Sequence, residues 1–281
     1  MIDEFVPIVP PVVQTIVERL RALPQVWALA LAGSQSTIRA DVRSDFDIYV
    51  FIDAAVPVAL RAELAREFAE RMEIDNQFFG PGDEWIEAAT GTKVDLIYFD
   101  VPWFEDQVER VLVRHQPSVG YSTAFWHTAR HAQPLYDRDG WLGRLKTLAA
   151  QPYPEPLRRA IVAHNHPILR DTLSSLVYQM ESALARNDMI SVQHRTTALL
   201  VSYFDILFAV NRLPHPGEKR QVQWLTTRGT QLPPEMEQQL NALLAVRPVQ
   251  ENGPLLIVRI HTLLDRLDEL LMAEQLIERT R

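Results

Sequence analysis

A strand-like run that begins with two aspartates occupies residues 45–52, with the sequence DFDIYVFI. Successive side chains of a β-strand point to opposite faces, so Asp45 and Asp47 share one face and lie about 6.7 Å apart along the strand. Phe46 and Ile48 then point the other way, into the core. Aspartate is disfavoured in strands, and two aspartates on one face repel each other, so we expect a cation to share this edge of the sheet.

The sequence around this run predicts an α/β domain over residues 1–150. Apolar runs without a helical stripe predict further strands at 26–32, 93–99 and, more briefly, 135–136. Helical spacing of apolar residues predicts helices near 11–23, 58–73, 102–115 and 141–150. Residues 74–91 mix strand-like residues with the turn signal Gly80-Pro81-Gly82-Asp83 and are assigned to no single element. The predicted fold class is therefore α/β (α+β), with a mixed sheet in this domain.

A proline cluster at residues 151–156, with the sequence QPYPEP, predicts the domain boundary. Beyond it the apolar periodicity is helical, in segments near 157–186, 189–213, 233–246 and 253–279. An all-α helical bundle over residues 151–281 is the most economical architecture for these segments.

Composition narrows the class of protein. The 281 residues are 47% hydrophobic and 23% charged, which excludes a disordered chain and provides material for two cores. The absence of cysteine excludes disulfides, thiolate zinc sites and cysteine nucleophiles, so any metal is held by oxygen or imidazole. The acidic, proline-broken start and the lack of an apolar stretch of about 18 residues predict a cytoplasmic protein without a signal peptide or membrane span.

Charge is unevenly distributed along the chain. The net charge of −8 disfavours a large nucleic-acid footprint. Residues 1–110 hold 20 acidic and 9 basic residues, a net −11, whereas residues 111–281 hold 16 and 19, a net +3. An acidic half can hold cations such as a metal or a polyamine, and a basic half can face phosphates. Two unrelated surface compositions would explain the same numbers equally well.

A third carboxylate and a small-residue loop complete a candidate site. Asp95 is alone among apolar residues near the start of the predicted strand 93–99, so Asp45, Asp47 and Asp95 can converge and hold two Mg²⁺ ions about 3.5–4 Å apart. Gly33-Ser34, directly after the strand 26–32, allows backbone and hydroxyl groups to approach a phosphate closely. This arrangement is suited to in-line nucleotidyl transfer.

These residues resemble the DNA polymerase β-like nucleotidyltransferase superfamily. Its pattern is Gly-Ser, about ten residues, Asp-x-Asp on a strand and a third acidic residue on a later strand, and the resemblance covers about residues 26–100. It implies that Asp45 and Asp47 bridge two metal ions and that Asp95 completes the catalytic metal site. It also implies that Gly33 and Ser34 contact the triphosphate of the nucleotide, and Ser44 fits the usual Ser-Asp-x-Asp form.

The second half of the chain adds to this resemblance, and one position within residues 26–100 departs from it. The helical second half looks like that of small-molecule nucleotidyltransferases, including those that adenylylate antibiotics. Many members carry a glycine near the position of Ile38, and its absence makes the loop less permissive.

Other polar residues compete with these assignments. Asp100, Asp75 and Glu73 are alternatives to Asp95 as the third carboxylate. His127 and His131 are four residues apart but lack the glutamate of a metalloprotease motif, which favours structural histidines.

Three residues of the helical half carry weaker signals. Lys219, after the turn at residues 213–217, can reach the phosphates of a nucleotide or belong to an ordinary solvated turn. Glu181 and Asp205 can act as a general base or lie on the wet face of a helix.

The sequence therefore predicts a metal-dependent nucleotidyltransferase. It would move a nucleoside monophosphate, with ATP as the expected donor, to a hydroxyl of a small-molecule acceptor and release pyrophosphate. The acidic first half suits a cationic acceptor such as an aminoglycoside. Two alternatives stay open: a toxin-like nucleotidyltransferase acting on tRNA or protein, against which net charge counts for tRNA, and a non-catalytic nucleotide-binding protein.

Overall fold

The computed structural model describes residues 10–32, 45–78, 80–247 and 249–278, in two compact units. The first unit comprises Met1–Val108 and Thr128–Gln151, and the second comprises Glu109–His127 and Pro152–Arg281. The chain therefore enters the second unit at Glu109, returns to the first at Thr128 and enters the second again at Pro152. No helix among the described residues is long and apolar enough to span a membrane.

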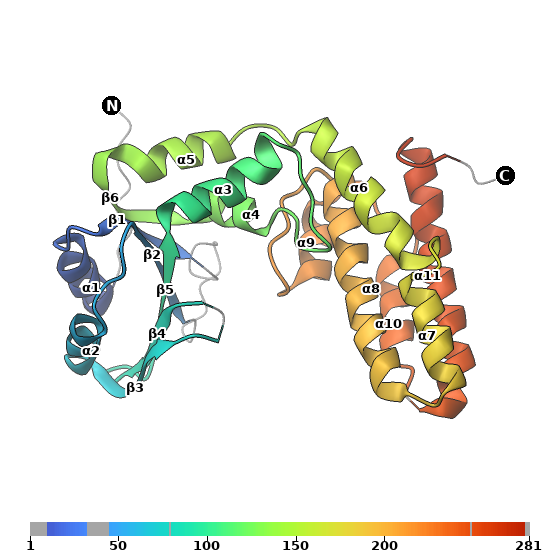
Figure 1. Ribbon diagram of the computed structural model, residues 1–281, viewed down its shortest axis with the longest axis horizontal. Helices are drawn as coiled ribbons and strands as arrows, with labels where there is room; N and C mark the ends of the chain where they lie inside the picture. Colours follow the sequence, from blue (N-terminus) through green and yellow to red (C-terminus); the bar gives the residue numbers. More distant parts are fainter. Residues whose placement is uncertain (1–9, 33–44, 79, 248, 279–281) are drawn as a thin grey trace. The chain divides into compact units, whose positions relative to one another are not determined.

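The first unit is built on a mixed sheet, whose described strands have the order β3-β4-β5-β2-β1-β6 (Figure 1). Strands β2 and β5 pair in parallel, and the other neighbours pair antiparallel. The strands are β1 (Val26–Ala32), β2 (Phe46–Ile52), β3 (Ala69–Asn76), β4 (Gly82–Glu87), β5 (Lys93–Asp100) and β6 (Gln133–Asp137). Parallel pairing of β2 and β5 places their amino ends at the same edge of the sheet.

Two helices, α1 (Pro11–Arg21) and α2 (Val58–Arg66), cover one face of this sheet (Figure 1). Their buried side chains join those of the central strands in one apolar core. Ile48 and Val50 of β2 belong to this core, as the strand alternation predicted for the run at 45–52. Each fully buried aliphatic side chain of this kind contributes about 1.5–3 kcal/mol to folding.

A buried ion pair also ties α2 to this face. Arg61 is 6% exposed and Asp83 of β4 is 1% exposed. Arg61 donates from Nη2 to Asp83 Oδ1 at 2.6 Å and from Nε to Oδ2 at 2.8 Å. Tyr98 donates its hydroxyl to Oδ2 at 2.8 Å, and the backbone N–H of Asp75 donates to Oδ1 at 2.9 Å. Both oxygens of the buried carboxylate are therefore satisfied.

An aromatic cluster occupies part of the opposite face. Phe51 of β2 lies 5.9 Å from Phe99 of β5, ring centre to ring centre. Phe104 of α3 (Val101–Leu112) and Trp141 of α5 (Trp141–Ala149) lie 4.9 Å and 5.0 Å from Phe51. Nearer the amino ends of β2 and β5, the same face carries charged residues instead of aromatic ones.

The second unit is helical, and α8 (Met189–Val210) forms the centre of its core. Every residue of α8 from Ser202 to Val210 is buried, as expected for a helix packed on all sides. The other helices are α6 (Glu155–Arg170), α7 (Leu176–Ala185), α9 (Gln221–Arg228), α10 (Met236–Leu244) and α11 (Gly253–Ala273). Helix α4 (Ala124–His131) crosses from the second unit into the first.

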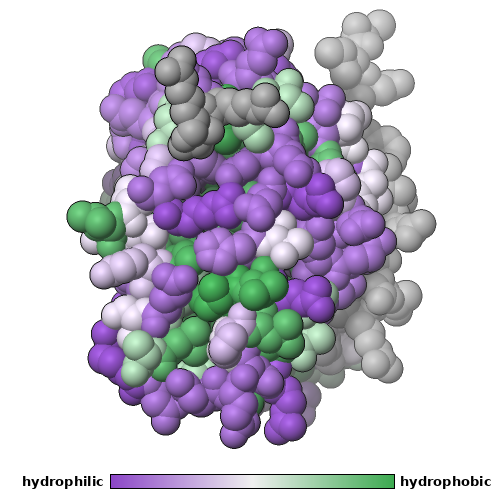
Figure 2. All heavy atoms as spheres, turned by 90° about the vertical axis from the view of Figure 1, so that its right-hand side faces the viewer, coloured by the Kyte–Doolittle hydropathy of each residue, from purple (hydrophilic) through white to green (hydrophobic). Residues whose placement is uncertain are grey.

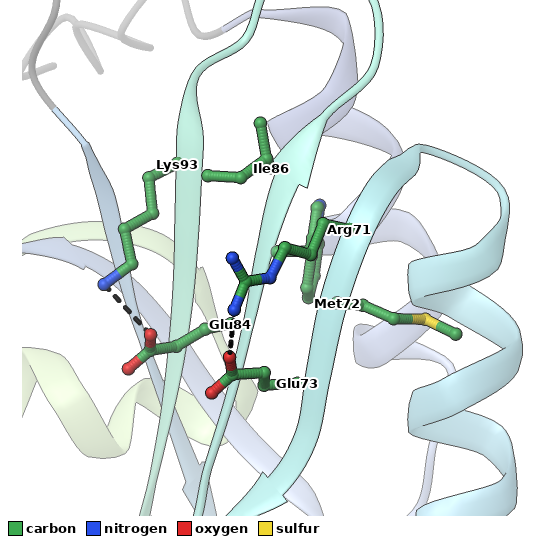
Figure 3. Close-up of a pocket in the computed structure, with 7 residues that line it drawn as sticks. Arg71, Met72, Glu73, Glu84, Ile86 and Lys93 are labelled. Carbon is green, nitrogen blue, oxygen red and sulfur yellow. Dashed lines mark hydrogen bonds and ion pairs between the residues drawn. The ribbon is translucent and has the colours of Figure 1, made fainter.

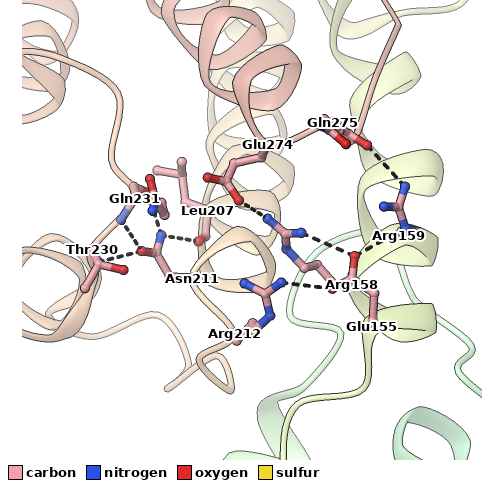
Figure 4. A network of polar contacts seen from close by, with 10 residues as sticks. All are labelled: Glu155, Arg158, Arg159, Leu207, Asn211, Arg212, Thr230, Gln231, Glu274 and Gln275. Carbon is pink, nitrogen blue, oxygen red and sulfur yellow. Dashed lines mark hydrogen bonds and ion pairs between the residues drawn. The ribbon is translucent and has the colours of Figure 1, made fainter.

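Ion pairs connect the start of α6 with the end of α11 (Figure 4). Arg158, 3% exposed, pairs with Glu274 at 2.5 Å and with Glu155 at 3.3 Å. Arg212, which follows α8, pairs with Glu155 at 3.1 Å. These contacts hold three helices together at one end of the bundle.

Some large apolar side chains of the second unit are exposed. Figure 2 shows apolar surface surrounded by polar surface on one face of the molecule. Leu255 and Val258 of α11 are 47% and 59% exposed and lie on one side of the helix, since residues three apart are neighbours. Helix α11 is therefore apolar beyond the side that faces the core.

Residues 118–122 are anchored to the bundle by two buried polar side chains. Asn165 of α6 accepts a bond from Gly120 N–H at 3.0 Å and donates to Ser118 O at 2.9 Å. Asp205 of α8 accepts from Ser122 N–H at 2.9 Å and from its hydroxyl at 2.7 Å. Burial raises the pKa of Asp205 to about 7, against the opposing effect of the Ser122 bonds. These bonds explain why this segment belongs to the second unit.

Gly120→Ala is expected to destabilise the second unit by about 2–4 kcal/mol, since it combines overpacking with backbone strain. Gly120 has a φ of +71°, and a Cβ there would lie 2.0 Å from Cγ1 of Val201. The matched control is Gly217→Ala, because Gly217 has a φ of +96° but nothing within 4 Å of its Cβ position. Urea denaturation of both variants measures the difference, and equal losses would show that contact with Val201 is unimportant.

The predicted fold class is confirmed, with an α/β sheet in the first half and helices in the second. The prediction of a single helix over residues 58–73 was wrong, because α2 ends at Arg66 and β3 begins at Ala69. Strand β3 is exposed along most of its length, so it lacks the apolar pattern of a buried strand. The single helix predicted at 157–186 is two helices, with Ser175 accepting a capping bond from the N–H of Tyr178 at the start of α7.

Candidate functional site

Asp47 of β2 and Asp95 of β5 lie directly opposite each other. They are partners in the parallel register of the two strands. Paired residues on neighbouring strands share a face of the sheet, and the strands lie about 4.8 Å apart. The structure therefore brings together two of the three predicted carboxylates.

Asp95 is in an unfavourable environment for a carboxylate. Burial raises its pKa to about 6, the Lys93 ammonium opposes this shift, and the charges of Glu84 and Asp47 add to it. The side chain is 15% exposed, and Lys93 contacts its Oδ2 at 3.1 Å. Its Oδ1 is buried and has no hydrogen-bond partner among the described residues. A buried, unsatisfied carboxylate oxygen costs free energy that a bound cation or donor would relieve.

The pair is part of a row of four carboxylates across four strands. Glu73 of β3 is opposite Glu84 of β4, and Glu84 is opposite Asp95, which is opposite Asp47. We call these residues the acid row. Like charges directly opposite each other destabilise a sheet, so the row requires cations.

Two basic side chains lie beside the acid row and partly neutralise it. Lys93 contacts Glu84 at 3.0 Å, and Arg71 contacts Glu73 at 3.1 Å. Figure 3 shows these four side chains lining a cavity of about 220 Å³ over β3, β4 and β5. Among the described side chains, the four carboxylates of the acid row therefore meet two cations.

Tyr49 follows Asp47 on the same face of β2. Burial raises the pKa of Tyr49 to about 12, the charge of Asp47 adds to this shift, and a hydrogen bond with Thr128 opposes it. The phenol therefore stays neutral at physiological pH. It separates the acid row from the aromatic cluster around Phe51 and Phe99.

Asp45 is exposed and immediately precedes β2. Within the described ranges, no three histidine, aspartate or glutamate side chains are grouped as a ready-made metal site, so Asp45 is not grouped with Asp47 and Asp95. Gly33, Ser34, Ile38 and Ser44 lie outside the described residues. Lys219 is exposed in the turn before α9, in the second unit.

Most of the competing residues have structural contacts. Asp75 accepts a bond from Arg61 at 3.2 Å, and Asp100 caps α3 by accepting from Trp103 N–H at 2.9 Å. His127 contacts the carbonyl of Pro214 at 3.2 Å and the ring of Trp224. Asp205 anchors Ser122 and does not lie on a wet helix face, whereas Glu181 does.

Glu84 and Lys93 were missed by the sequence reasoning. They lie on the two arms of the hairpin that joins β4 and β5, in which Glu84 pairs with Asp95. Gly91 marks the turn of that hairpin in the sequence. The turn closes between Glu87 and Thr92, whose backbone groups are hydrogen-bonded, and counting outward from this pair places Glu84 opposite Asp95. This hairpin was not predicted because residues 74–91 mix strand-like residues with the turn signal at residues 80–83.

The donor set fits a hard divalent cation. Magnesium prefers carboxylate oxygens, keeps several waters and is typically bound through one or two carboxylates together with substrate phosphates. Asp47 and Asp95 supply such oxygens, and the buried Oδ1 of Asp95 lacks any other described partner.

No protein-family model matches this chain, and no curated protein matches it. Among solved structures, the chain is similar to the crystal structure of a nucleotidyltransferase-like protein from Exiguobacterium sibiricum 255-15. The alignment covers 94% of this chain and 74% of that chain, at 13% sequence identity and a TM-score of 0.45. A likeness at this level establishes neither a family nor an activity.

Proposed function

We propose that this protein is a metal-dependent nucleotidyltransferase. It transfers a nucleoside monophosphate, AMP from ATP, to a hydroxyl group of a cationic small molecule and releases pyrophosphate. The acceptor oxygen forms a bond to the α-phosphorus, the bond from that phosphorus to the β-phosphate oxygen breaks, and the hydroxyl proton passes to water.

The observation that carries this proposal is the Asp47–Asp95 pair. Two carboxylates face each other on parallel strands, and one of their oxygens is buried without a described partner. A structural ion pair would instead satisfy its oxygens, as Arg61 does for Asp83 on the other face of the sheet. The contrast between the two faces favours a ligand-binding role for Asp47 and Asp95.

Asp47 and Asp95 would hold Mg²⁺, with Asp45 as the third carboxylate implied by the resemblance. When bound, the metal neutralises charge on the phosphates and lowers the pKa of the attacking hydroxyl. Gly33, Ser34 and Ser44 would contact the triphosphate, and Lys219 would add a cation at the phosphates. Lys93, already in contact with Asp95, limits the repulsion within the acid row before substrate binds.

The rest of the acid row supports a cationic acceptor. Glu84 and Glu73 continue the row away from Asp95 and line the cavity of about 220 Å³. Side chains of this charge concentrate cationic ligands at a surface. An amine-bearing acceptor bound over Glu73 and Glu84 would present a hydroxyl toward Asp95 and Asp47.

The direct test is an assay with nucleoside triphosphates labelled at the α-phosphate. The protein is incubated with each triphosphate, Mg²⁺ and one of four acceptors: an aminoglycoside, an uncharged polyol, tRNA or a cell-protein extract. We expect label from ATP on the aminoglycoside, with equal release of pyrophosphate and no reaction after chelation of the metal. Label on tRNA or protein would favour the toxin-like alternative, and nucleotide binding without pyrophosphate release would favour a non-catalytic protein.

Glu84→Gln is expected to raise KM for a cationic acceptor about ten-fold, because one charge contact at a partly exposed site is worth about 1 kcal/mol or slightly more. KM for an uncharged acceptor should change little. Steady-state kinetics with both acceptors measures the two values, and Glu63→Gln on the exposed surface of α2 is the control. An equal rise in both KM values would contradict the charge-based explanation.

A further inference from the structure

A second cavity of about 410 Å³ lies at the carboxyl ends of β2 and β5. Its size falls in the range of pockets that bind small molecules. Ile52 and Asp100, which line it, are partners in the same parallel register as Asp47 and Asp95. They lie five residues further along both strands, about 16 Å away. The cavity is therefore separate from the acid row.

The wall of this cavity is mainly apolar and includes an accessible aromatic side chain. Trp103, in the first turn of α3, is 43% exposed. Its ring is nearly parallel to that of Phe99, at an interplanar angle of 8° and a centroid distance of 6.0 Å. Ile52 and Ile97 add aliphatic surface, and Ala54 and Ala55 leave room because their side chains are small. A planar ring can extend such a stack and gain about 0.5–1.5 kcal/mol beyond its area burial.

Among the described residues that line this cavity, Asp100 carries the one charged side chain. Its Oδ1 accepts the capping bond from Trp103 N–H at 2.9 Å. Its Oδ2 has no partner in the part of the chain that the structure describes, and the lining includes no lysine or arginine there. A cationic group on the ligand would pair with this oxygen and would also be attracted to the face of the nearby indole.

We propose that this cavity is a second ligand site, which binds a planar aromatic molecule carrying a protonated amine. The ring lies against Trp103 and the apolar wall, and the ammonium group pairs with Asp100. Shape selects the ring, and charge selects a cation over a neutral or anionic analogue. The site does not depend on the proposed nucleotidyl transfer, because it lies at the opposite ends of β2 and β5 from Asp47 and Asp95.

The test compares three indoles that differ mainly in charge: tryptamine, indole and indole-3-acetate. Binding to the full chain, without nucleotide or metal, is measured by calorimetry or by ligand-observed NMR. We expect saturable binding of tryptamine at least ten-fold tighter than that of indole-3-acetate, with indole between them.

Three variants locate the binding. Asp100→Asn should remove the preference for tryptamine over indole, and helix α3 should remain capped because asparagine is also a good N-cap residue. Trp103→Leu should weaken all three ligands at least five-fold, and Ala55→Trp should block the cavity. Asp139→Asn, an exposed charge change that leaves the cavity lining intact, is the matched control and should change none of the affinities. Circular dichroism confirms that each variant is folded.

Three results would overturn this assignment: no saturable binding of tryptamine up to 5 mM, equal affinity for all three indoles, or tryptamine binding that survives both Trp103→Leu and Ala55→Trp. None of these results bears on nucleotidyl transfer, because nucleotide and metal are absent. Failure of the transfer assay would equally leave this ligand site intact.

Discussion

Asp47→Asn and Asp95→Asn should each lower the rate of nucleotidyl transfer by about 10³-fold or more. Asparagine keeps the shape of the side chain but removes the charge that would hold the metal. Metal ions stabilise the transition-state charge by several kcal/mol, and 4 kcal/mol corresponds to a factor of about 10³ in rate. The measurement is the initial rate of labelled product with saturating ATP, Mg²⁺ and acceptor.

The fold of these variants should be intact, which separates lost chemistry from lost structure. Asp95→Asn removes the repulsion that Glu84 and Asp47 exert on a buried carboxylate, so its thermal midpoint should not fall. Asp139→Asn serves as the charge-change control. A folded Asp95→Asn protein that transfers label at the normal rate would refute the proposed site. Asp45→Asn then decides whether the exposed aspartate before β2 joins the other two when nucleotide and metal bind.

Arg61→Ala is expected to lower the free energy of unfolding of the first unit by about 3–5 kcal/mol, since it leaves a buried charge uncompensated. Asp83 is 1% exposed and would lose its bidentate contact with the guanidinium, and the bonds that remain, from Tyr98 and from the N–H of Asp75, carry no positive charge. The loss is measured by urea denaturation, monitored by a spectroscopic signal that reports on unfolding of the sheet.

The control for this effect is an exposed ion pair on the same unit. Arg19 and Glu67 lie 2.7 Å apart, with side chains 59% and 35% exposed, so Arg19→Ala should cost less than about 1 kcal/mol. Similar losses in Arg61→Ala and Arg19→Ala would contradict the importance of burial. Replacing Arg61 and Asp83 together by apolar residues of similar size should recover much of the stability.

The sequence predicted the central strands well and the edge strand poorly, for a physical reason. Strands β1, β2 and β5 are at least partly buried on both faces over most of their length and appear in the sequence as apolar runs. Strand β3 lies at the edge of the sheet with mostly exposed side chains, so its sequence resembles a polar helix. Local sequence does not show where a strand lies in the sheet.

The candidate site was predictable in part. Asp47 and Asp95 could be selected because each is a charged residue in an apolar run. A charge in a buried strand is unfavourable unless a partner or ligand compensates it. Their register across parallel strands, and the addition of Glu84, depend on pairing between distant segments that no local pattern encodes. The roles of Gly33, Ser34, Ser44 and Lys219 stay predictions.

The path of the chain between the two units limits how the protein can be taken apart. Residues 109–127 leave the sheet unit, are fixed to Asn165 and Asp205, and lead back to it. A fragment ending at Gln151 would carry this segment without its anchors, and a fragment starting at Pro152 would have a buried Asp205 with no Ser122 to bind. The two units are therefore not consecutive stretches of sequence that can be exchanged at a single boundary. Joining the sheet unit to a different helical domain requires that residues 109–127 be exchanged as well.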